Sequence, residues 1–384
     1  MRIVHWCSSF LAGGGVAEAV LGLANAQTLR GYEVMVVSRE HRNSPAYRPR
    51  LRADLQAELH AWDPVRTLMV GKLPASLVPR RSIAAIRRFE PDILHLHTGI
   101  LPEDVMARRA VPRTRAVLSP HGAFYPQVLG RKLRPFVTVL KPVFYSRLSA
   151  FHAVSPGEAT MIQRLFRRHE IYVVPNGLAA DFKIPAATNS DRDETPGRAI
   201  RLICVGRLDT RTKVLDILLH SFAQAAAQSP QRLELVFVGS RSGSDYADLV
   251  AIVDQLGLGN RVLFTGMTDR EGVNRYFETA DIYVQTSRWD ACSQASIEAI
   301  ALELPCILSS RSGASTYPNI AALPHIHVVE PNIEQVTAAI LEVAQSLQVQ
   351  RESARKSGPA SREFFSWERA ALEHERVYSR LMAT

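Results

Sequence analysis

The sequence is poor in cysteine and in aromatic residues, and each shortage excludes a class of protein. Only 4 of the 384 residues are cysteine, with no Cys-x-x-Cys pair and no histidines at zinc-binding spacing. We therefore expect reduced thiols rather than a disulfide framework. Aromatic residues make up 7% of the chain, and it carries no zinc-finger, RNA-recognition or helix-turn-helix pattern, which weighs against nucleic-acid binding.

Long hydrophobic runs are also missing. Apolar stretches such as Val137–Tyr145 are interrupted by Lys or Arg and fall short of the roughly 20 residues that cross a bilayer. The N-terminus enters a Gly-rich turn without the apolar core and cleavage site of a signal peptide. These absences predict a cytoplasmic protein without a transmembrane helix.

Length and charge indicate two domains, the first of them basic. At about 100 to 200 residues per domain, a chain of this length predicts two. Residues 1–185 hold 26 Lys and Arg against 13 Asp and Glu, whereas the whole chain has a net charge of +9. The basic half implies an anionic partner, which could be nucleic acid, a membrane surface or a phosphorylated substrate, or else it serves solubility alone.

β-Branched runs alternate with amphipathic segments along the chain, a pattern that predicts two doubly wound, Rossmann-like α/β domains. The expected strands are residues 3–6, 34–37, 93–96, 116–118, 151–154 and 172–174, then 202–205, 235–238, 262–264, 282–284, 306–308 and 327–329. The expected helices are residues 16–29, 103–109, 133–148, 157–166, 214–227, 246–256, 270–279 and 293–302, followed by a helical segment from 333 to the end.

The expected domain boundaries follow from composition. Residues 1–182 form the first domain, a polar stretch at 183–198 is the linker, and 199–365 form the second domain. Because such sheets bind ligands at the carboxyl ends of their strands, we expect the chemistry in a cleft between the domains.

In the first domain, a Gly-rich loop and three histidines follow expected strands. Gly13, Gly14 and Gly15 open the first helix, which suits a phosphate or sugar cradle as well as a simple turn. The dinucleotide and P-loop patterns both fail here. His95 and His97 share one face of a strand, and packed, hydrogen-bonded histidines are favoured over a metal site. His121 ends another strand, where a neutral imidazole could bind a sugar hydroxyl or have no role.

In the second domain, two cations and two carboxylates follow expected strands. Arg207 and Lys213 stand near a helix start, where a diphosphate would be stabilised by the guanidinium fork, the ammonium and the helix dipole. Asp290 lies in a later loop and Glu298 in the helix after it. Ser293 is expected to cap that helix, so the loop residues Ala291, Cys292 and Ser293 would present free N–H groups.

Together these segments resemble the retaining glycosyltransferases of family 4, which have the GT-B fold. The resemblance covers nearly the whole chain. Its ordered signals are the Gly-rich loop, Ser-Pro-His-Gly at 119–122, His-Ala-Val-Ser-Pro-Gly-Glu at 152–158, Val-Pro-Asn-Gly at 174–177, Gly-Arg-Leu-Asp at 206–209 with Lys213, Phe-Thr-Gly at 264–266, and the acidic pair. The departures are Asp290 where the family usually has Glu, Ala-Cys-Ser after it in place of Gly-Phe-Gly, and Val214 in place of Gly.

The resemblance implies a role for each site residue. Arg207 and Lys213 would hold the donor diphosphate, Glu298 the ribose and Asp290 the transferred sugar. His121 would touch the reacting end of that sugar, and backbone groups near Met267 would bind the base. The Gly13–Gly15 loop would approach the phosphate and the acceptor, and a C-terminal helix at about 366–384 would cross back to the first domain.

The function implied is a metal-independent, retaining hexosyltransferase without a cofactor. It would move sugar from a UDP- or GDP-sugar to a saccharide acceptor, lipid-linked, in cell-surface polysaccharide synthesis. The single Asp-x-Asp, at 191–193, lies in the linker and is discounted as a metal site. A nucleotide-sugar epimerase and a nucleic-acid-binding protein are the alternatives.

Peripheral binding to an anionic membrane is a further expectation. The basic residues that suggest it are Arg80, Arg81, Arg87, Arg88, Arg131, Lys132, Arg134 and Lys141. The segment 132–145 mixes cations with apolar residues and could lie in the interface. A buried helix with basic ends explains the same pattern.

Overall fold

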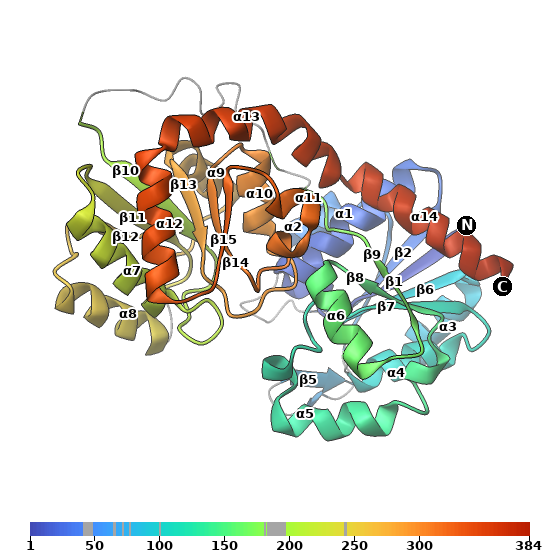
Figure 1. Ribbon diagram of the computed structural model, residues 1–384. Coiled ribbons are helices and arrows are strands. Elements are labelled where there is room, and N and C mark those ends of the chain that lie inside the picture. The colour runs from blue at the N-terminus through green and yellow to red at the C-terminus, as the bar shows by residue number, and fades with distance from the viewer. Residues whose placement is uncertain are drawn as a thin grey trace. The chain divides into compact units, whose positions relative to one another are not determined.

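The computed structural model describes residues 1–40, 49–63, 67–70, 73–76, 78–99, 101–179, 182, 197–241 and 244–384. Contacts divide the chain into two compact units: unit 1 is Met1–Ala180 with Ser366–Thr384, and unit 2 is Asp181–Phe365 (Figure 1). The linker expected at 183–198 lies outside the described residues up to position 196. No helix in the described ranges is both long and apolar enough to span a membrane.

Unit 1 is built on a parallel sheet whose strand order reverses beside its first strand. Across the sheet the strands are β3 (Glu58–Trp62), β2 (Glu33–Arg39), β1 (Arg2–Trp6), β6 (Ile93–His97), β7 (Arg115–Ser119), β8 (Ala150–Ala153) and β9 (Glu170–Val173). An antiparallel pair, β4 (Thr67–Val70) and β5 (Leu73–Ser76), stands apart from it. The order turns between β1 and β6, which is where doubly wound sheets bind ligands.

The helices of unit 1 pack on both faces of its sheet. They are α1 (Gly15–Leu29), α2 (Pro49–Asp54), α3 (Arg80–Phe89), α4 (Pro102–Ala110), α5 (Pro126–Leu140), α6 (Pro156–Leu165) and α14 (Trp367–Ala383). One apolar cluster holds the stacked rings of Trp6 and Trp62, and the other joins α1 and α14 to the opposite face.

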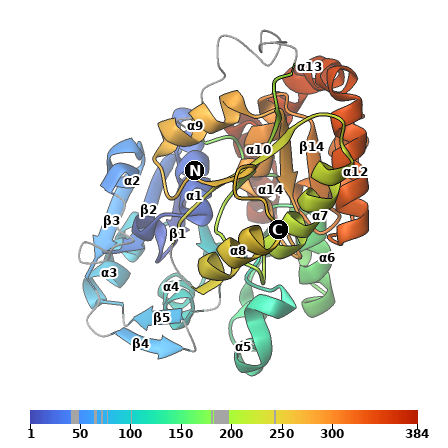
Figure 2. The same cartoon turned by 90° about the vertical axis from the view of Figure 1, so that its left-hand side faces the viewer.

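Unit 2 has a second parallel sheet with the strand order of a dinucleotide-binding fold. Across the sheet the strands are β12 (Val262–Phe264), β11 (Leu233–Val238), β10 (Ile200–Val205), β13 (Ile282–Gln285), β14 (Cys306–Ser309) and β15 (Ile326–Val329). The helices are α7 (Leu215–Gln228), α8 (Ser244–Gln255), α9 (Arg270–Thr279), α10 (Gln294–Ala301), α11 (Pro318–Ala321), α12 (Ile333–Gln345) and α13 (Leu347–Phe364) (Figure 1 and Figure 2). The prediction of two doubly wound α/β sheets is confirmed.

The last helix returns the chain to unit 1, as the resemblance implied. The Trp367 ring lies between two glycines, because a Cβ built on Gly22 or on Gly177 would overlap its ring atoms at 2.1 Å and 2.6 Å. Gly177 closes the Val-Pro-Asn-Gly signal, so that motif provides the space into which α14 docks. The four cysteines are free and buried, and burial raises the thiol pKa of Cys7 and Cys204 to about 12.

One helix prediction was wrong in its bounds. A helix was expected over 133–148, but α5 covers Pro126–Leu140, with a non-helical backbone at Gly130 (φ 51°, ψ −173°), and is followed by a short 3-10 turn at Tyr145–Arg147. Proline is tolerated at the first helical position, and Pro142 has no N–H to donate to the Thr138 carbonyl, so the helix ends before it. The helix expected at about 366–384 matches α14, which Ser366 caps by accepting from the Arg369 N–H at 3.2 Å, and the helical segment before it divides into α12 and α13.

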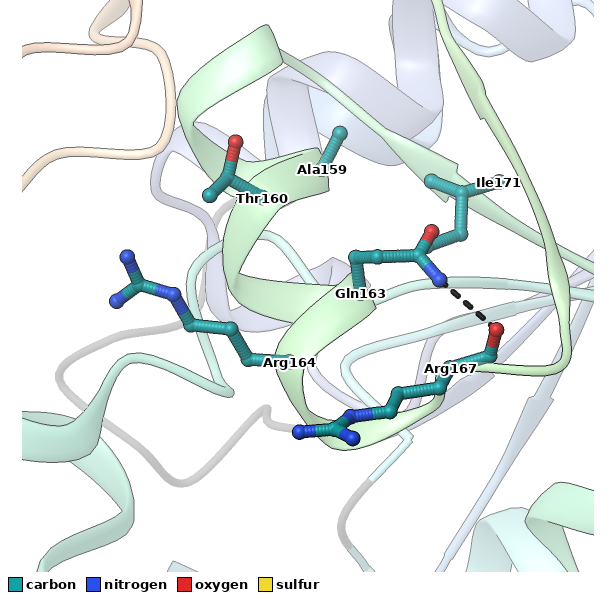
Figure 3. Close-up of a pocket in the computed structure, with 6 residues that line it drawn as sticks. All are labelled: Ala159, Thr160, Gln163, Arg164, Arg167 and Ile171. Carbon is teal, nitrogen blue, oxygen red and sulfur yellow. Dashed lines mark hydrogen bonds between the residues drawn. The ribbon is translucent and has the colours of Figure 1, made fainter.

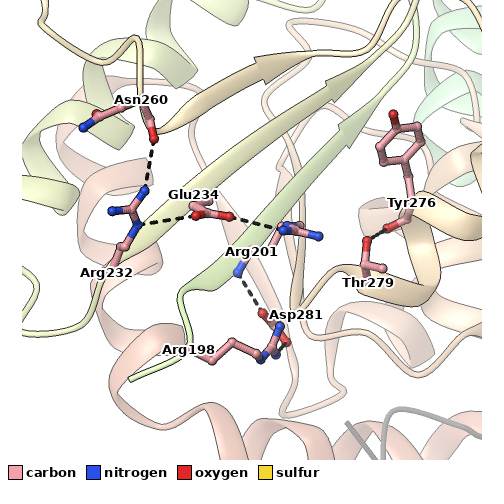
Figure 4. Close-up of polar contacts among 8 residues, drawn as sticks. All are labelled: Arg198, Arg201, Arg232, Glu234, Asn260, Tyr276, Thr279 and Asp281. Atoms are coloured by element: carbon pink, nitrogen blue, oxygen red, sulfur yellow. Dashed lines mark hydrogen bonds and ion pairs between the residues drawn. The ribbon is translucent and has the colours of Figure 1, made fainter. Parts of the chain in front are cut away.

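A buried carboxylate fixes the start of two strands in unit 2. Asp281 has no solvent exposure and accepts from the Arg201 N–H at 2.7 Å and from the Arg198 guanidinium at 2.5 Å (Figure 4). It also pairs with Arg351 of α13, which is itself buried. The carboxylate therefore ties the entry of β10, the entry of β13 and α13 together.

We predict that Asp281→Asn lowers the free energy of unfolding by about 3 to 5 kcal/mol, because it leaves the buried Arg351 charge without its counter-charge. Urea unfolding followed by circular dichroism measures the change. The matched control is Glu234→Gln, which breaks the half-exposed pair with Arg201 and should cost about 1 kcal/mol or less. Equal losses in the two variants would contradict the structural role of Asp281.

Candidate functional site

One predicted cation and one predicted carboxylate of unit 2 meet where the strand order of its sheet reverses. The loop after β10 carries Arg207 and Lys213, and the loop after β13 carries Asp290. The Lys213 ammonium donates to Asp290 Oδ2 at 2.8 Å, and both side chains are largely buried. Backbone contacts align the same two loops, since the Arg288 N–H donates to the Thr212 carbonyl at 2.9 Å. The structure thus brings together two residues that lie 77 positions apart in the sequence.

Asp290 is held from its own side of the site as well. The Gln285 amide donates to Asp290 Oδ2 at 3.3 Å, and the Gln285 carbonyl oxygen accepts from the hydroxyls of Ser296 and Ser312. All three supporting side chains are buried. The orientation of the Asp290 carboxylate therefore depends on β13, α10 and the segment after β14.

Glu298 forms the second ion pair of the site. Its two carboxylate oxygens accept from the two terminal nitrogens of Arg270 at 2.6 and 2.9 Å. Glu298 is buried, whereas Arg270, the first residue of α9, is partly exposed. The prediction singled out Glu298 without this partner. Arg270 was missed because nothing in the local sequence shows that α9 and α10 face each other, and Gln285 was missed because its contact with Asp290 depends on the path of the loop after β13.

Arg207 differs from the other charged residues of the site because it is exposed. It follows Gly206, whose positive φ of 146° suits glycine. A Cβ at Gly206 would lie 3.7 Å from the Lys213 side chain. The stem of Lys213 therefore passes beside the residue that precedes Arg207.

The turn after Lys213 is strained. Val214 precedes α7 with φ 45° and ψ 50°, the left-handed conformation that a β-branched residue seldom adopts. Its side chain is fully buried and packs into the unit. This is the position where the resembling family usually has glycine, so the sequence departure keeps the backbone shape and adds strain.

The loop before α10 is shaped by a glycine from another segment. A Cβ on Gly313 would lie 1.7 Å from the Ala291 carbonyl oxygen and 2.9 Å from the Cys292 nitrogen. Ser293 is the N-cap residue of α10, but its side chain makes no capping hydrogen bond, so the predicted cap is wrong in that respect. Met267 is 74% exposed beside the positive-φ Gly266.

In unit 1 the Gly-rich loop and His121 also occupy the carboxyl edge of the sheet. Gly13 and Gly14 have φ of 82° and 90°, and Gly15 begins α1. The N-cap residue Gly14 makes no side-chain capping hydrogen bond to that helix. His121 has a positive φ of 50°, and the Gly122 N–H next to it donates to the buried Glu158 at 2.5 Å. Glu158, which was not singled out, therefore fixes the turn that carries His121.

His95 and His97 are packed and hydrogen-bonded, as predicted, but within a larger cluster than the sequence indicated. The buried histidines on this face of the sheet are His5, His95, His97, His152 and His374, and His121 joins them at the edge. They come from four strands or strand ends and from α14. Their proximity follows from strand register, in which His5 stands opposite His95.

Three of these residues have ligand atoms close enough for a metal ion. One nitrogen each of His5, His95 and His97 lies within 4.8 Å of the others. However, both ring nitrogens of all three residues are already hydrogen-bonded, to one another, to His121 or to Gln27, Tyr378 and Ser119. A metal would have to displace that network, so the arrangement favours a hydrogen-bonded cluster.

Burial sets the charge state of the cluster. It lowers the pKa of His5 to about 4 and that of His121 to about 3, and it holds the pKa of His95, His97 and His374 well below the ordinary value. The imidazoles are therefore neutral near pH 7. In this state each ring has one N–H donor and one acceptor nitrogen.

Two hollows of unit 1 are lined by arginine. One lies along α6, where Gln163 donates to the Arg167 carbonyl at 3.0 Å; Figure 3 shows that the guanidinium groups of Arg164 and Arg167 do not converge. The other lies between α4 and the turn after α5, with Arg109, Val143 and Arg147 in its lining.

Known protein families match the sequence over nearly its whole length. The model described as Glycosyltransferase Family 4 matches residues 13–182, and the model described as Glycosyl transferases group 1 matches residues 187–362. The chain belongs to the group 1 and family 4 glycosyltransferases. This assignment favours a glycosyltransferase over the epimerase and nucleic-acid alternatives.

Individual glycosyltransferases resemble the chain more distantly. The lipopolysaccharide core biosynthesis glycosyltransferase LpsD of Rhizobium meliloti is 24% identical over 318 residues, 82% of this chain and 80% of that protein. The GDP-mannose:cellobiosyl-diphosphopolyprenol alpha-mannosyltransferase of Xanthomonas oryzae is 23% identical over 321 residues, 80% and 78% of the two chains. The D-inositol 3-phosphate glycosyltransferase of Jonesia denitrificans is 29% identical over 183 residues, and this match spans 42% of that protein and 47% of this chain.

Solved structures show the same fold at low identity. Anabaena HepE in complex with UDP-glucose superposes with a TM-score of 0.75 at 17% identity, covering 99% of this chain and 100% of that one. The sucrose-phosphate synthase of Thermosynechococcus elongatus gives 0.73 at 20% identity, covering 100% and 99%. The glycosyltransferase has the GT-B fold.

We predict that unit 1 loses stability as the pH falls below 6.5. The folded-state pKa of the buried histidines is lowered, so below their ordinary value of about 6.5 the unfolded chain binds more protons than the folded one. Each histidine then removes up to about 1.4 kcal/mol per pH unit from the free energy of unfolding. Urea unfolding at pH 7.5, 6.5 and 5.5, followed by tryptophan fluorescence, measures the loss. Unit 1 holds Trp6, Trp62 and Trp367, and a constant midpoint over this range would contradict the prediction.

Proposed function

We propose that this glycosyltransferase moves a sugar from a UDP- or GDP-sugar to a saccharide acceptor, with retention at the anomeric carbon and without a bound metal. The observation that carries the proposal is the placement of Arg207 and two ion pairs in segments that follow the carboxyl ends of the unit 2 strands. Doubly wound sheets bind nucleotides at this point. Anabaena HepE, with the same fold, binds UDP-glucose.

Different charged residues bind different parts of the donor. The exposed guanidinium of Arg207 offers a planar fork to the diphosphate, and Lys213 adds a point charge next to it. As the nucleoside diphosphate leaves, the growing negative charge is stabilised by cations that are already in place, which is electrostatic catalysis. These fixed cations supply the charge that a metal ion would otherwise provide.

The carboxylates and backbone groups position the rest of the donor. Glu298, held by Arg270, accepts from the ribose hydroxyls, and Asp290, held by Lys213 and Gln285, accepts from hydroxyls of the transferred sugar. Backbone groups near Met267 bind the base. The N–H groups of the Ala291–Ser293 loop, at the start of α10, bind phosphate or sugar oxygens. In unit 1, His121 binds the sugar, and the Gly13–Gly15 loop binds the phosphate and the acceptor.

A lipid-linked acceptor and a role in cell-surface polysaccharide synthesis complete the proposal. The relatives from R. meliloti and X. oryzae are named for lipopolysaccharide core biosynthesis and for a diphosphopolyprenol acceptor. Unit 1 carries a surface suited to an anionic membrane, around the end of α5. There the exposed Val139 and Val143 stand with the exposed cations Lys141, Arg147 and, on α4, Arg109. The side chains of Arg131, Lys132 and Arg134 lie outside the described residues.

We predict that the enzyme hydrolyses one donor slowly in the absence of acceptor, and that Arg207→Ala lowers this rate by about a hundredfold or more. Glu298→Gln should raise the KM for the donor. Release of sugar from UDP-, GDP- and ADP-sugars, read by ¹H NMR, measures the rate and shows whether the anomeric configuration is retained. EDTA should leave the rate unchanged.

The matched control for Arg207→Ala is Arg232→Ala, which removes an exposed arginine from the amino edge of the same sheet. This variant should keep the wild-type rate. A rate that is equally low in both arginine variants, or product with inverted configuration, would contradict the proposal. Binding of no nucleotide in the panel would refute the diphosphate assignment.

We predict that the protein sediments with vesicles that contain phosphatidylglycerol but not with vesicles of pure phosphatidylcholine. Val139→Asp should weaken the association at least fivefold, because it places a charge on the apolar part of the surface, and Arg147→Glu should do the same at low salt. The control is Val349→Asp on α13, since Val349 is 67% exposed and Val139 is 69% exposed. Equal vesicle binding by all three variants would argue against this surface.

A further inference from the structure

A row of hydrogen bonds leads from His121 into the interior of unit 1. His121 Nε2 lies 2.9 Å from His97 Nδ1, and His97 Nε2 lies 3.1 Å from His5 Nδ1. His5 Nε2 lies 2.7 Å from Gln27 Oε1, the carbonyl oxygen of a buried amide on α1. The row thus runs through three rings and ends at a group that can only accept.

In a row of neutral imidazoles, all the hydrogen bonds run in the same donor-to-acceptor direction. Each neutral ring has one N–H, so a ring that donates at one nitrogen must accept at the other. His5 donates from Nε2 to Gln27, which makes its Nδ1 the acceptor for His97 Nε2–H. His97 Nδ1 is then the acceptor for His121 Nε2–H. The Nδ1 of His121 is then unprotonated and carries a lone pair. It has no hydrogen-bond partner within the described parts of the chain.

We propose that Gln27, His5 and His97 are positioning residues that hold His121 in its Nε2–H tautomer and so present Nδ1 to the substrate as a hydrogen-bond acceptor. The substrate group this favours is a sugar hydroxyl, which donates to Nδ1. A phosphate oxygen, which can only accept, is disfavoured at this position. The assignment of a sugar to His121 rests on the proposed function, whereas the tautomer does not.

The amide of Gln27 sets the direction of the row. Turned about, Gln27 would donate to His5 and reverse every hydrogen bond as far as His121. The amide nitrogen forms no hydrogen bond of ordinary geometry within the described residues. The orientation in the structure places the carbonyl oxygen Oε1 2.7 Å from His5 Nε2, and this orientation makes His5 the donor.

In a second row of hydrogen bonds in the same cluster, a backbone carbonyl sets the direction. His152 Nε2 donates to the Val174 carbonyl at 2.9 Å, so its Nδ1 accepts from Ser119 at 2.6 Å. Ser119 then accepts from His95 Nε2, and His95 Nδ1 accepts from Tyr378. This row ends inside the unit. Only the row through His97 reaches the edge of the sheet.

The backbone at the outer end of the row keeps the ring in place. His121 is fixed by the hydrogen bond from the Gly122 N–H to Glu158, and its ring stacks on that of His97 with centroids 5.2 Å apart. Because the ring cannot turn freely, the tautomer decides which kind of group it offers.

The test reads tautomers directly in the full-length protein. Long-range ¹H–¹⁵N NMR of protein labelled with ¹⁵N-histidine separates protonated from unprotonated ring nitrogens, and single His→Gln variants assign the signals. At pH 7.5, His5, His97 and His121 should each show a protonated Nε2 and an unprotonated Nδ1. A protonated Nδ1 on His121 would overturn the proposal, whether or not a donor is turned over.

Gln27→Met removes the terminal acceptor at nearly constant volume. The His121 signals should then shift to a mixture of tautomers, and donor hydrolysis should slow about fivefold, the effect of losing one hydrogen bond. The control is Tyr172→Phe, which removes a buried hydrogen bond to His374 at 3.0 Å outside the row and should leave the His121 tautomer unchanged. An unchanged tautomer in Gln27→Met would refute the relay. The expected tautomers in a protein that hydrolyses no donor would refute the proposed function alone.

Discussion

The ion pair between Lys213 and Asp290 is the interaction on which the candidate donor site depends. It joins the loops that follow β10 and β13, the two strands between which the order of the sheet reverses. A parallel sheet brings the carboxyl ends of its strands to one edge, but it does not orient the side chains there. The pair, with Gln285 behind Asp290 and Arg270 on Glu298, supplies that orientation before any ligand binds.

Unit 1 has the same kind of parallel sheet as unit 2, but its polar residues are arranged differently. At the carboxyl edge of that sheet, buried histidines from neighbouring strands hydrogen-bond to one another and stay neutral because burial lowers their pKa. A neutral cluster can be packed in the core without counter-charges, and it can still fix the direction of its hydrogen bonds. Unit 2 thus holds fixed charges at its candidate site, and unit 1 holds fixed hydrogen-bond donors and acceptors.

The sequence predicted the strands of both parallel sheets other than β3, because buried parallel strands are short β-branched runs, and the family signals pointed to Arg207, Lys213, Asp290 and Glu298. It could not predict partners that depend on tertiary packing. No local pattern shows how α9, the helix that Arg270 begins, lies relative to α10. His5 and His97 are 92 residues apart, so no local pattern shows that they hydrogen-bond. The end of α5 before Pro142 was misjudged, because the missing N–H of proline outweighs apolar periodicity there. The arginine-rich α3 and the strand β3 were not among the expected elements.

The most direct test of the account is a crystal structure of the full-length enzyme with the nucleoside diphosphate that it binds. The account predicts the diphosphate on Arg207 and Lys213 and the ribose hydroxyls on Glu298, with Asp290 facing the position of the sugar. A nucleotide bound in unit 2 away from these four residues, or bound on unit 1 alone, would contradict it.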